Sequence, residues 1–287
     1  MQRALCVVAV LAAHAQAEPP QRAPEEAASE PNDIVARPIV LDRGQLDAEL
    51  VLGISGSPIG EPTSLSPDVW FGATERLTVG VIHSSRSVDQ FSPAASFCVR
   101  HELYTCPRTY HGSGLDARFA ALPWLAPRVR LLLRDIDPAK PALALGALVH
   151  WTRGRFAITS DPYLRLGLAN TELGNRHALV LPVAFAVQPL ARWEVSLHTG
   201  WNGDFAVIED GWHVPVAIGT RVAVTSEIDV GALLGFATLL GPQNTPRDRA
   251  LFVSVAYRRQ LMHSPPSAAI ARASARSAAA DSPASRD

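Results

Sequence analysis

The sequence predicts an all-β protein, a transmembrane antiparallel up-and-down β-barrel of about 12 strands. From about residue 45 to residue 258, apolar residues alternate with polar or small ones at a period of two, which is typical of strands. The connections between these strands alternate between short and long, as the two ends of a membrane barrel do. The chain of 287 residues has room for one large domain or two small ones, and its formal net charge of -1 argues against a general polyanion binder.

The N-terminus reads as a secretory signal over residues 1–17. Arg3 supplies a positive charge, residues 5–13 are an apolar core too short to span a bilayer, and Ala15-Gln16-Ala17 fits a small-x-small cleavage site. Residues 18–43 are rich in Pro, Glu and Ala and are expected to form a flexible periplasmic leader. No later segment has the 18 or more uncharged apolar residues of a membrane-spanning helix.

The alternation is clearest in RWEVSLHTGW at 192–201, where Trp193, Val195, Leu197 and Trp201 lie on one side and polar or small residues on the other. The same pattern predicts strands at 45–54, 66–73, 77–83, 113–122, 128–134, 142–151, 155–168, 178–188, 192–201, 213–224, 228–236 and 250–258. Asp161-Pro162 is expected to bulge or break the seventh strand. The barrel is therefore placed at residues 44–259, with a disordered, low-complexity C-terminal tail at 260–287.

The connections predict which end of the barrel each loop belongs to. Short turns are expected near 74–76, 123–127, 152–154, 189–191 and 225–227, and longer loops at 55–65, 84–112, 135–141, 169–177, 202–212 and 237–249. In outer-membrane barrels the short turns are periplasmic and the long loops extracellular. An even number of strands returns both termini to the periplasmic side.

Tryptophan positions favour a membrane barrel over a soluble secreted β-sandwich, which is the alternative fold. Trp193 and Trp201 lie eight residues apart on one face, about 26 Å at ~3.3 Å per residue. This matches the apolar band of an outer-membrane barrel, about 25 Å tall with an aromatic girdle at each edge. The expected girdle residues are Trp124, Trp151, Trp193, Trp201, Trp212 and Tyr257, whereas Trp70, inside the second strand, fits less well.

The polar face of the strands is expected to meet the lumen. The candidates for lining it are Arg118, Arg130, Arg165, Glu194, His198 and Arg221, and many of their neighbours on this face are Gly or Ala, which suits a narrow interior. Charges of both signs can line a pore or form a salt-bridged plug, and both interpretations remain open.

Two cysteines, Cys98 and Cys106, remain once Cys6 leaves with the signal. In an exported chain this even count predicts one disulfide closing a small loop. A zinc site with His101 and Glu102 is the competing interpretation, which the absence of a CxxC pair disfavours.

Several stretches together resemble a family of uncharacterised, porin-like outer-membrane β-barrel proteins of Gram-negative bacteria. They are the signal, LTVGV at 77–81, the two-cysteine loop followed by Gly-Leu-Asp-Ala at 114–117, the V-P-V-A pattern at 214–217 and the closing LFVSVAY at 251–257. The resemblance covers about residues 45–258 and implies only a fold and an outer-membrane location, since the family has no assigned activity. Such barrels commonly end on an aromatic residue that serves as the assembly signal, and this chain departs from that pattern because Tyr257 is followed by about 30 residues.

No hydrolase, zincin, phosphate-loop or dinucleotide motif is present. His83 beside Ser84, and His198, raise the alternative of a barrel-embedded lipid hydrolase, although polar residues at a strand rim explain them more simply. Asp204, Glu209 and Asp210 raise the alternative of a calcium-binding loop, although a solvated acidic loop explains them more simply.

The sequence therefore favours a passive channel for small solutes. No cofactor, metal or nucleic acid is expected, and the expected partners are outer-membrane lipid and the barrel-assembly machinery. A non-conducting structural or adhesive barrel that acts through its outer loops is the other alternative.

Overall fold

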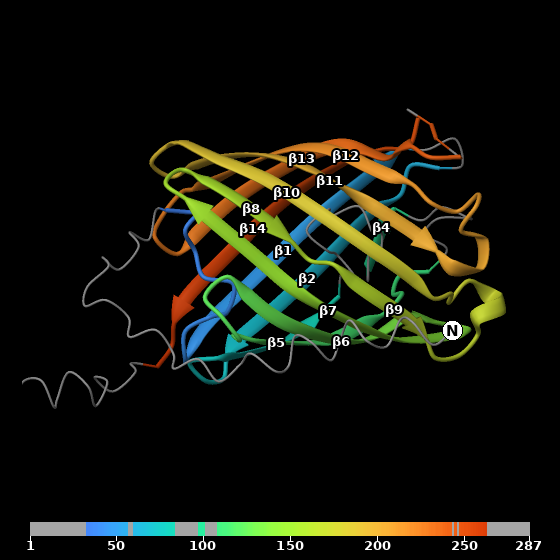
Figure 1. Cartoon of the computed structure of the whole chain (residues 1–287), viewed down its shortest axis with the longest axis horizontal. Helices are drawn as coiled ribbons and strands as arrows, with labels where there is room; N and C mark the ends of the chain where they lie inside the picture. The colour runs from blue at the N-terminus through green and yellow to red at the C-terminus, as the bar shows by residue number, and fades with distance from the viewer. Residues whose placement is uncertain are drawn as a thin grey trace, which may run out of the picture. The chain divides into compact units, whose positions relative to one another are not determined.

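A single antiparallel sheet closes on itself to form a barrel. The computed structural model describes residues 33–56, 60–83, 97–100, 108–242, 244–245 and 247–262. The strands are β1 (Gln45–Gly56), β2 (Thr63–Gly72), β3 (Leu77–Ile82), β4 (Phe97–Arg100), β5 (Ser113–Phe119), β6 (Leu125–Ile136), β7 (Ala139–Arg153), β8 (Phe156–Ser160), β9 (Tyr163–Gly167), β10 (Ala178–Leu190), β11 (Trp193–Asp204), β12 (Val214–Ala223), β13 (Ile228–Leu240) and β14 (Arg249–Gln260). The barrel closes because β1 pairs with both β2 and β14 (Figure 1).

The described strands fill twelve positions around the barrel, which confirms the predicted fold class. β8 and β9 are two halves of one position, since both lie between β7 and β10. Asp161 and Pro162 separate them, as the sequence predicts, because proline lacks the N–H that a ladder needs. β4 pairs with the first residues of β2, beyond the part of β2 that pairs with β3, and its Phe97 also forms a bridge with Tyr110.

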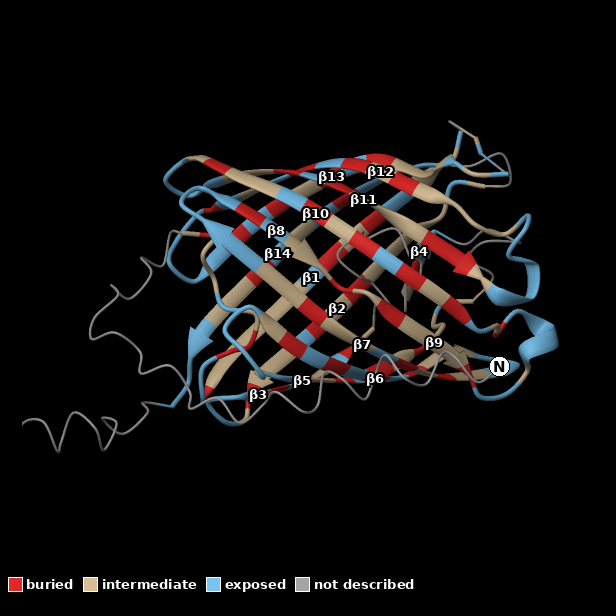
Figure 2. Ribbon diagram, in the orientation of Figure 1, coloured by how far each residue is buried: buried red, intermediate tan, exposed pale blue. Residues whose placement is uncertain are grey.

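Burial along the strands follows the predicted alternation, with the apolar side facing outward. Leu115, Val129 and Leu131 are 46 to 58% exposed, while Asp116 and Arg130, which alternate with them, are 3% and 1% exposed. Figure 2 shows buried and exposed segments alternating along the ribbons. This inversion of a soluble protein's pattern is typical of a membrane barrel, whose outer surface meets lipid.

The short turns and the longer loops lie at opposite ends of the barrel, which we call the short-turn end and the long-loop end (Figure 1, left and right). The prediction of a longer connection at 135–141 is wrong, because only Asp137 and Pro138 separate β6 from β7. The pairing of these two strands shifts between Leu133 and Ile136, and the strands continue into what was expected to be loop.

Two 3-10 helices, η1 (Thr171–Leu173) and η2 (Phe205–Val207), interrupt the loops at the long-loop end. Within the described residues, neither has the length or the apolar character needed to cross a membrane.

Residues 33–43, which we call the N-terminal strap, do not match the expected flexible leader. Ile34, Val35, Val40 and Leu41 are each at most 8% exposed. Val40 packs with the inward-facing Ala126 and Leu148, so this part of the chain lies inside the barrel. Composition could not predict this, since the apolar residues that pack here are scattered among polar ones. The rest of the leader, the signal and the tail beyond residue 262 lie outside the described residues.

Candidate functional site: the charged lumen

The inner wall carries two groups of charged side chains. The first, which we call the arginine–aspartate cluster, consists of Asp116, Arg118, Arg128, Arg130 and Asp161. The second, the Arg221 cluster, consists of Arg221 with Asp47, Glu49, Glu194, Asp229, Arg258 and Arg37 of the strap. The two clusters lie on different strands and differ in how tightly they are packed.

The arginine–aspartate cluster is built on β5, β6 and the break between β8 and β9. Arg128 donates to Asp116 through two nitrogens, each 2.8 Å from a carboxylate oxygen, and to Asp161 at 2.5 Å. Arg118 donates to Asp116 at 3.0 Å, and Arg130 lies 3.4 Å from Asp161. Every side chain in the cluster is at most 17% exposed. Such close, charge-assisted pairs behave as a fixed cross-link between strands.

Two aromatic rings complete this cluster. The indole N–H of Trp70 donates to Asp116 at 2.9 Å, and the Arg118 guanidinium lies over the Trp70 ring, 4.9 Å from its centroid. The Arg130 guanidinium lies 4.2 Å from the centroid of the Tyr163 ring, within cation–π distance. Trp70 therefore faces the lumen, which explains why it did not fit the outer girdle.

The Arg221 cluster lies on β1 and β11 to β14. Arg221 is 3.7 Å from Glu49, Arg258 is 2.6 Å from Asp47, and Arg37 pairs with Asp229. Glu194 is the register partner of Arg221 in the pairing of β11 with β12. Four carboxylates and three guanidiniums give this cluster a formal charge of −1, against +1 for the three arginines and two aspartates of the first.

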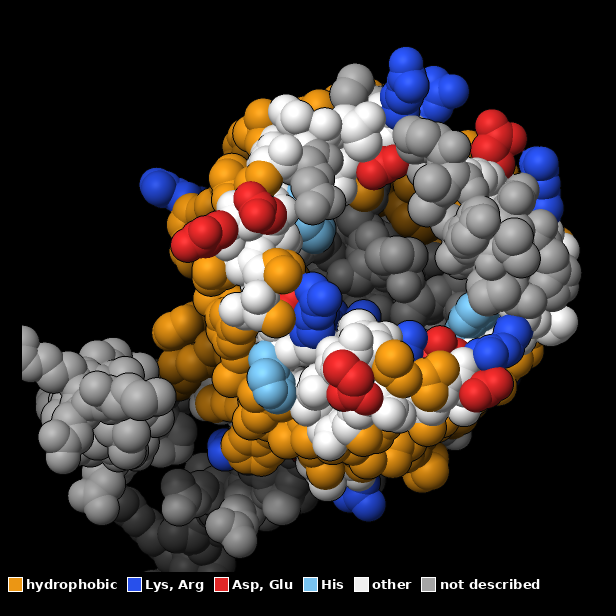
Figure 3. All heavy atoms as spheres, turned by 90° about the vertical axis from the view of Figure 1, so that its right-hand side faces the viewer, with side chains coloured by type: hydrophobic (Ala, Val, Ile, Leu, Met, Phe, Trp, Pro, Cys, Tyr) orange, Lys and Arg blue, Asp and Glu red, His pale blue; other side chains and the backbone are white. Residues whose placement is uncertain are grey.

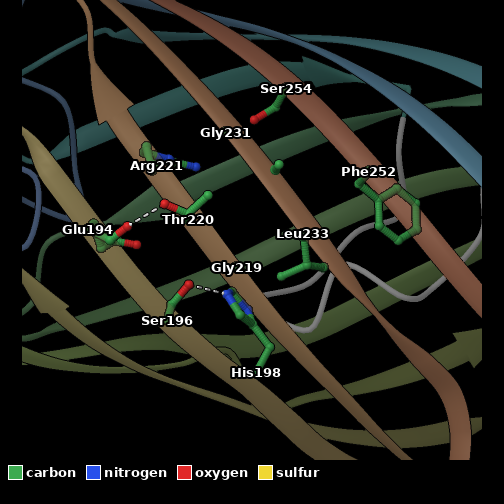
Figure 4. Close-up of a pocket in the computed structure, with 11 residues that line it drawn as sticks. Glu194, Ser196, His198, Gly219, Thr220, Arg221, Gly231, Leu233, Phe252 and Ser254 are labelled. Carbon is green, nitrogen blue, oxygen red and sulfur yellow. Dashed lines mark hydrogen bonds between the residues drawn. The ribbon is translucent and has the colours of Figure 1, made fainter.

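A pocket opens beside Arg221 on the wall formed by β11 to β14 (Figure 4). It is lined by Glu194, Ser196, His198, Gly219, Thr220, Arg221, Gly231, Ala232, Leu233, Phe252 and Ser254. Gly219 lets its neighbours approach closely, since a Cβ there would lie only 2.7 Å from the Ser196 hydroxyl and 3.1 Å from His198 Nε2. The large side chains of the arginine–aspartate cluster lie on other strands, away from this pocket.

The six predicted lumen residues lie in different parts of the inner wall. Arg118 and Arg130 belong to the arginine–aspartate cluster, and Glu194, His198 and Arg221 border the pocket. Arg165, on β9, faces inward in the strand alternation and donates to the backbone carbonyl of Arg176 at 3.4 Å. Figure 3 shows charged and histidine side chains around the hollow of the long-loop end, and hydrophobic side chains over much of the outer surface.

The predicted girdle residues are distributed over both ends. Trp124, Trp151 and Trp193 are 38 to 49% exposed near the short turns, and Tyr257 lies on the same rim at the end of β14. The Trp193 N–H donates to Thr220 on the outer face at 2.7 Å. Trp201 and Trp212, both half-buried, belong to the long-loop end.

Of the predicted disulfide, Cys98 is on β4, with its sulfur 3.4 Å from His111 Nε2. Cys106, together with His101, Glu102 and Ser84, lies outside the described residues, so the disulfide remains a prediction.

The histidines singled out for chemistry have structural contacts. His83 Nδ1 lies 2.6 Å from the Pro67 carbonyl, and its ring is 5.8 Å from that of Phe97. His198 Nε2 does lie 2.8 Å from the Ser196 hydroxyl, but both side chains face the lumen against the Gly219 backbone. In the part of the chain that the structure describes, no three His, Cys, Asp or Glu side chains group as metal ligands.

Sequence reasoning missed Trp70, Arg128 and Asp161 as members of one cluster. Trp70 shares its strand face with Ser66 and Asp68, so parity could have identified it. Asp161 gave no signal except the adjoining proline, because its approach to Arg128 depends on the barrel closing around both.

Comparisons with known proteins give likeness of structure without likeness of sequence. No family model matches the chain, and no curated protein matches it. Among solved structures, an outer-membrane channel of Pseudomonas putida F1 is 12% identical, with 77% of this chain and 97% of that one covered and a TM-score of 0.49.

Two further solved structures are also outer-membrane proteins. A bacterial polysaccharide outer membrane secretin is 13% identical over 78% of this chain and 100% of its own, with a TM-score of 0.41. The outer membrane protein Omp33 of Acinetobacter baumannii is 9% identical over 75% and 98%, with a TM-score of 0.39.

Proposed function

We propose that this chain is an outer-membrane channel for small polar solutes, which pass along the wall formed by β11 to β14. The observation that carries the proposal is the pocket of small and polar inward residues around Glu194 and Arg221, inside a closed barrel whose outer surface is apolar. A closed barrel leaves no unpaired strand edge in lipid, and a polar inner wall offers solutes hydrogen bonds in place of water.

The remaining parts of the proposal follow from the same fold. The secretory signal delivers the chain to the periplasm, the assembly machinery inserts it, and both termini stay on the periplasmic side, where the short turns lie. Trp124, Trp151, Trp193 and Tyr257 then form the periplasmic girdle, and Trp201 and Trp212 the outer one, because indole rings favour the membrane interface.

Arg221 is the residue to substitute in a test of ion selectivity. Arg221 retains 30% exposure of its side chain and borders the pocket, whereas the Arg130 side chain is 1% exposed and held by Asp161 and Tyr163. Neutralising Arg221 changes the charge that a passing ion meets. Neutralising Arg130 disturbs the wall itself.

Single-channel recording in a planar bilayer tests the function. Wild-type protein should show discrete conductance steps. Arg221→Gln should move the reversal potential in a salt gradient toward cation selectivity, and Glu194→Gln should move it toward anion selectivity. Arg153→Gln, at an exposed position beside a short turn, is the matched control and should leave the reversal potential unchanged. Folded protein that never conducts would reject the channel.

A closed barrel that acts through its outer loops is the second candidate. The arginine–aspartate cluster fills one wall and the strap lies inside the short-turn end, so the interior is partly occupied. This candidate predicts folded protein without conductance and loss of its cellular role when residues 86–110 are deleted.

Of the two histidines in the hydrolase alternative, His83 and His198, it is His198 that has a described serine hydroxyl beside it, that of Ser196. The side chains of Ser196 and His198 pack against Gly219 on the lumen wall, away from the lipid that such an enzyme would attack. We therefore propose a structural role for the pair. Ester hydrolysis by purified protein that Ser196→Ala abolishes would contradict this.

A further inference from the structure

The N-terminal strap crosses the lumen at the short-turn end. Its backbone N–H groups at Ile34 and Val35 donate to the side chain of Gln188 on β10, at 2.8 and 3.2 Å. Leu41 N–H donates to the Thr78 hydroxyl on β3 at 2.8 Å. β3 and β10 are five positions apart in a ring of twelve, which places them nearly opposite each other.

A second pair of contacts crosses in another direction. The Val35 carbonyl accepts from His150 Nε2 on β7 at 2.9 Å, and Arg37 pairs with Asp229 on β13. These strands are also five positions apart. The side chains of His150 and Asp229 face inward near the short turns. The strap is therefore held at four sites around one rim.

The C-terminal end of the strap is fixed by a tight turn into β1. Gly44 has a φ of 77°, in the left-handed region that favours glycine, and its N–H donates to the Gly72 carbonyl at 2.8 Å. This turn holds one end of the strap at β1 and β2, and the four contacts above hold the rest of it across the opening.

Arg37 brings a charge of the strap into the Arg221 cluster. Its guanidinium pairs with both carboxylate oxygens of Asp229, with one nitrogen 3.0 Å from Oδ1, and the two side chains are 14% and 7% exposed. Without Arg37 the formal charge of the cluster would change from −1 to −2.

We propose that the strap is the size- and charge-determining element of the short-turn exit, and that Arg37 is its selectivity-determining residue. The inference rests on the proposed channel. With the strap in place the opening at the short-turn end is narrow. The positive charge of Arg37 offsets the negative charge of Asp229, which limits the channel's preference for small cations. Loss of the strap widens the exit, and loss of the Arg37 charge alone makes it more cation-selective at nearly unchanged width.

The test is single-channel recording of full-length variants that keep heat-modifiable migration on gels, in a potassium chloride gradient. Deletion of residues 33–41 should raise the conductance at least twofold. Arg37→Gln should shift the reversal potential toward cation selectivity without such a rise. Arg43→Gln is the matched control, since Arg43 belongs to the same segment but is exposed, and it should match wild type.

Each outcome decides one of the two proposals. Conducting wild-type protein whose conductance is unaltered by the deletion overturns the strap and leaves the channel. Equal reversal potentials for Arg37→Gln and Arg43→Gln overturn the role of Arg37. Closed wild-type protein that conducts after deletion supports the strap as a full closure. If neither conducts, the channel fails, and the inference with it.

A second variant keeps the proposal open to test if the deletion does not fold. Gln188→Ala with His150→Ala removes three of the strap's hydrogen bonds and leaves its sequence intact. This protein should show larger or more frequent openings than wild type. Unchanged recordings would overturn the proposal.

Discussion

Asp116 shows that one inward-facing carboxylate can bind side chains from several strands of this barrel. Its carboxylate accepts hydrogen bonds from Arg118, Arg128 and the Trp70 ring, which come from three strands. The side chain is fully buried, so its charge is balanced by these donors and not by water. Removing it would leave neighbouring guanidiniums facing one another in a poorly solvated space.

Asp116→Ala should therefore destabilise the barrel by about 3–5 kcal/mol, the usual loss when one partner of a buried ion pair is removed. The measurement is urea-dependent unfolding in lipid vesicles, followed by gel mobility. Glu75→Ala is the control, because Glu75 is exposed in the turn between β2 and β3 and should change stability by less than about 0.5 kcal/mol. Equal stability of the two variants would show that the cluster does not cross-link the wall.

Gly219 makes a second prediction at the scale of a residue. A larger side chain there would meet Ser196 and His198 and reduce the open space of the pocket. Gly219→Val should lower single-channel conductance at least twofold while the protein remains folded. Gly56→Val, whose Cβ would make only an ordinary 3.6 Å contact, should conduct as wild type. Unchanged conductance in Gly219→Val would mean that solutes do not pass along this wall.

At the scale of the strand, the outer face should be sensitive to charge according to depth. Leu131 lies in the middle of β6 and is 51% exposed on the apolar surface, whereas Leu190 ends β10 beside a short turn and is 61% exposed. Leu131→Arg should destabilise the folded protein in lipid by about 2–4 kcal/mol, and Leu190→Arg by about 0–1 kcal/mol. Equal effects would place the membrane elsewhere on the barrel.

The strands were predictable because apolar residues alternate with polar or small ones at a period of two, and this alternation indicates which side of each strand faces outward. That pattern alone locates all twelve positions and the inward parity of residues such as Arg118 and Arg221. It does not show that Asp161 meets Arg128, or that Val35 lies inside the lumen. Those contacts join parts of the chain that only barrel closure brings together, so no local pattern of residues records them.

At the scale of the whole molecule, the lumen is asymmetric. Bulky arginines with Trp70 and Tyr163 occupy one wall, small residues around Gly219 line the other, and the strap lies across one end. An up-and-down barrel of twelve positions has little interior to spare, so filling one wall directs any passage toward the other. In the proposed channel, the path of a solute and the rigidity of the barrel would thus be set by different strands.

The barrel closes where β1 pairs with β14. Truncations should show that this closure does not need the C-terminal tail. The two strands pair from Gln45 opposite Gln260 to Gly56 opposite Arg249, and Arg258 is 2.6 Å from Asp47 across the seam. Deleting residues 263–287 leaves every one of these pairs, so the protein should still fold and migrate in a heat-modifiable manner. Deleting residues 249–287 exposes the edges of β1 and β13, which cannot be satisfied in lipid, and should give aggregated protein. If the shorter deletion also abolished heat-modifiable migration, the tail would have to take part in assembly, and Tyr257 at the end of β14 would not be a sufficient terminal signal.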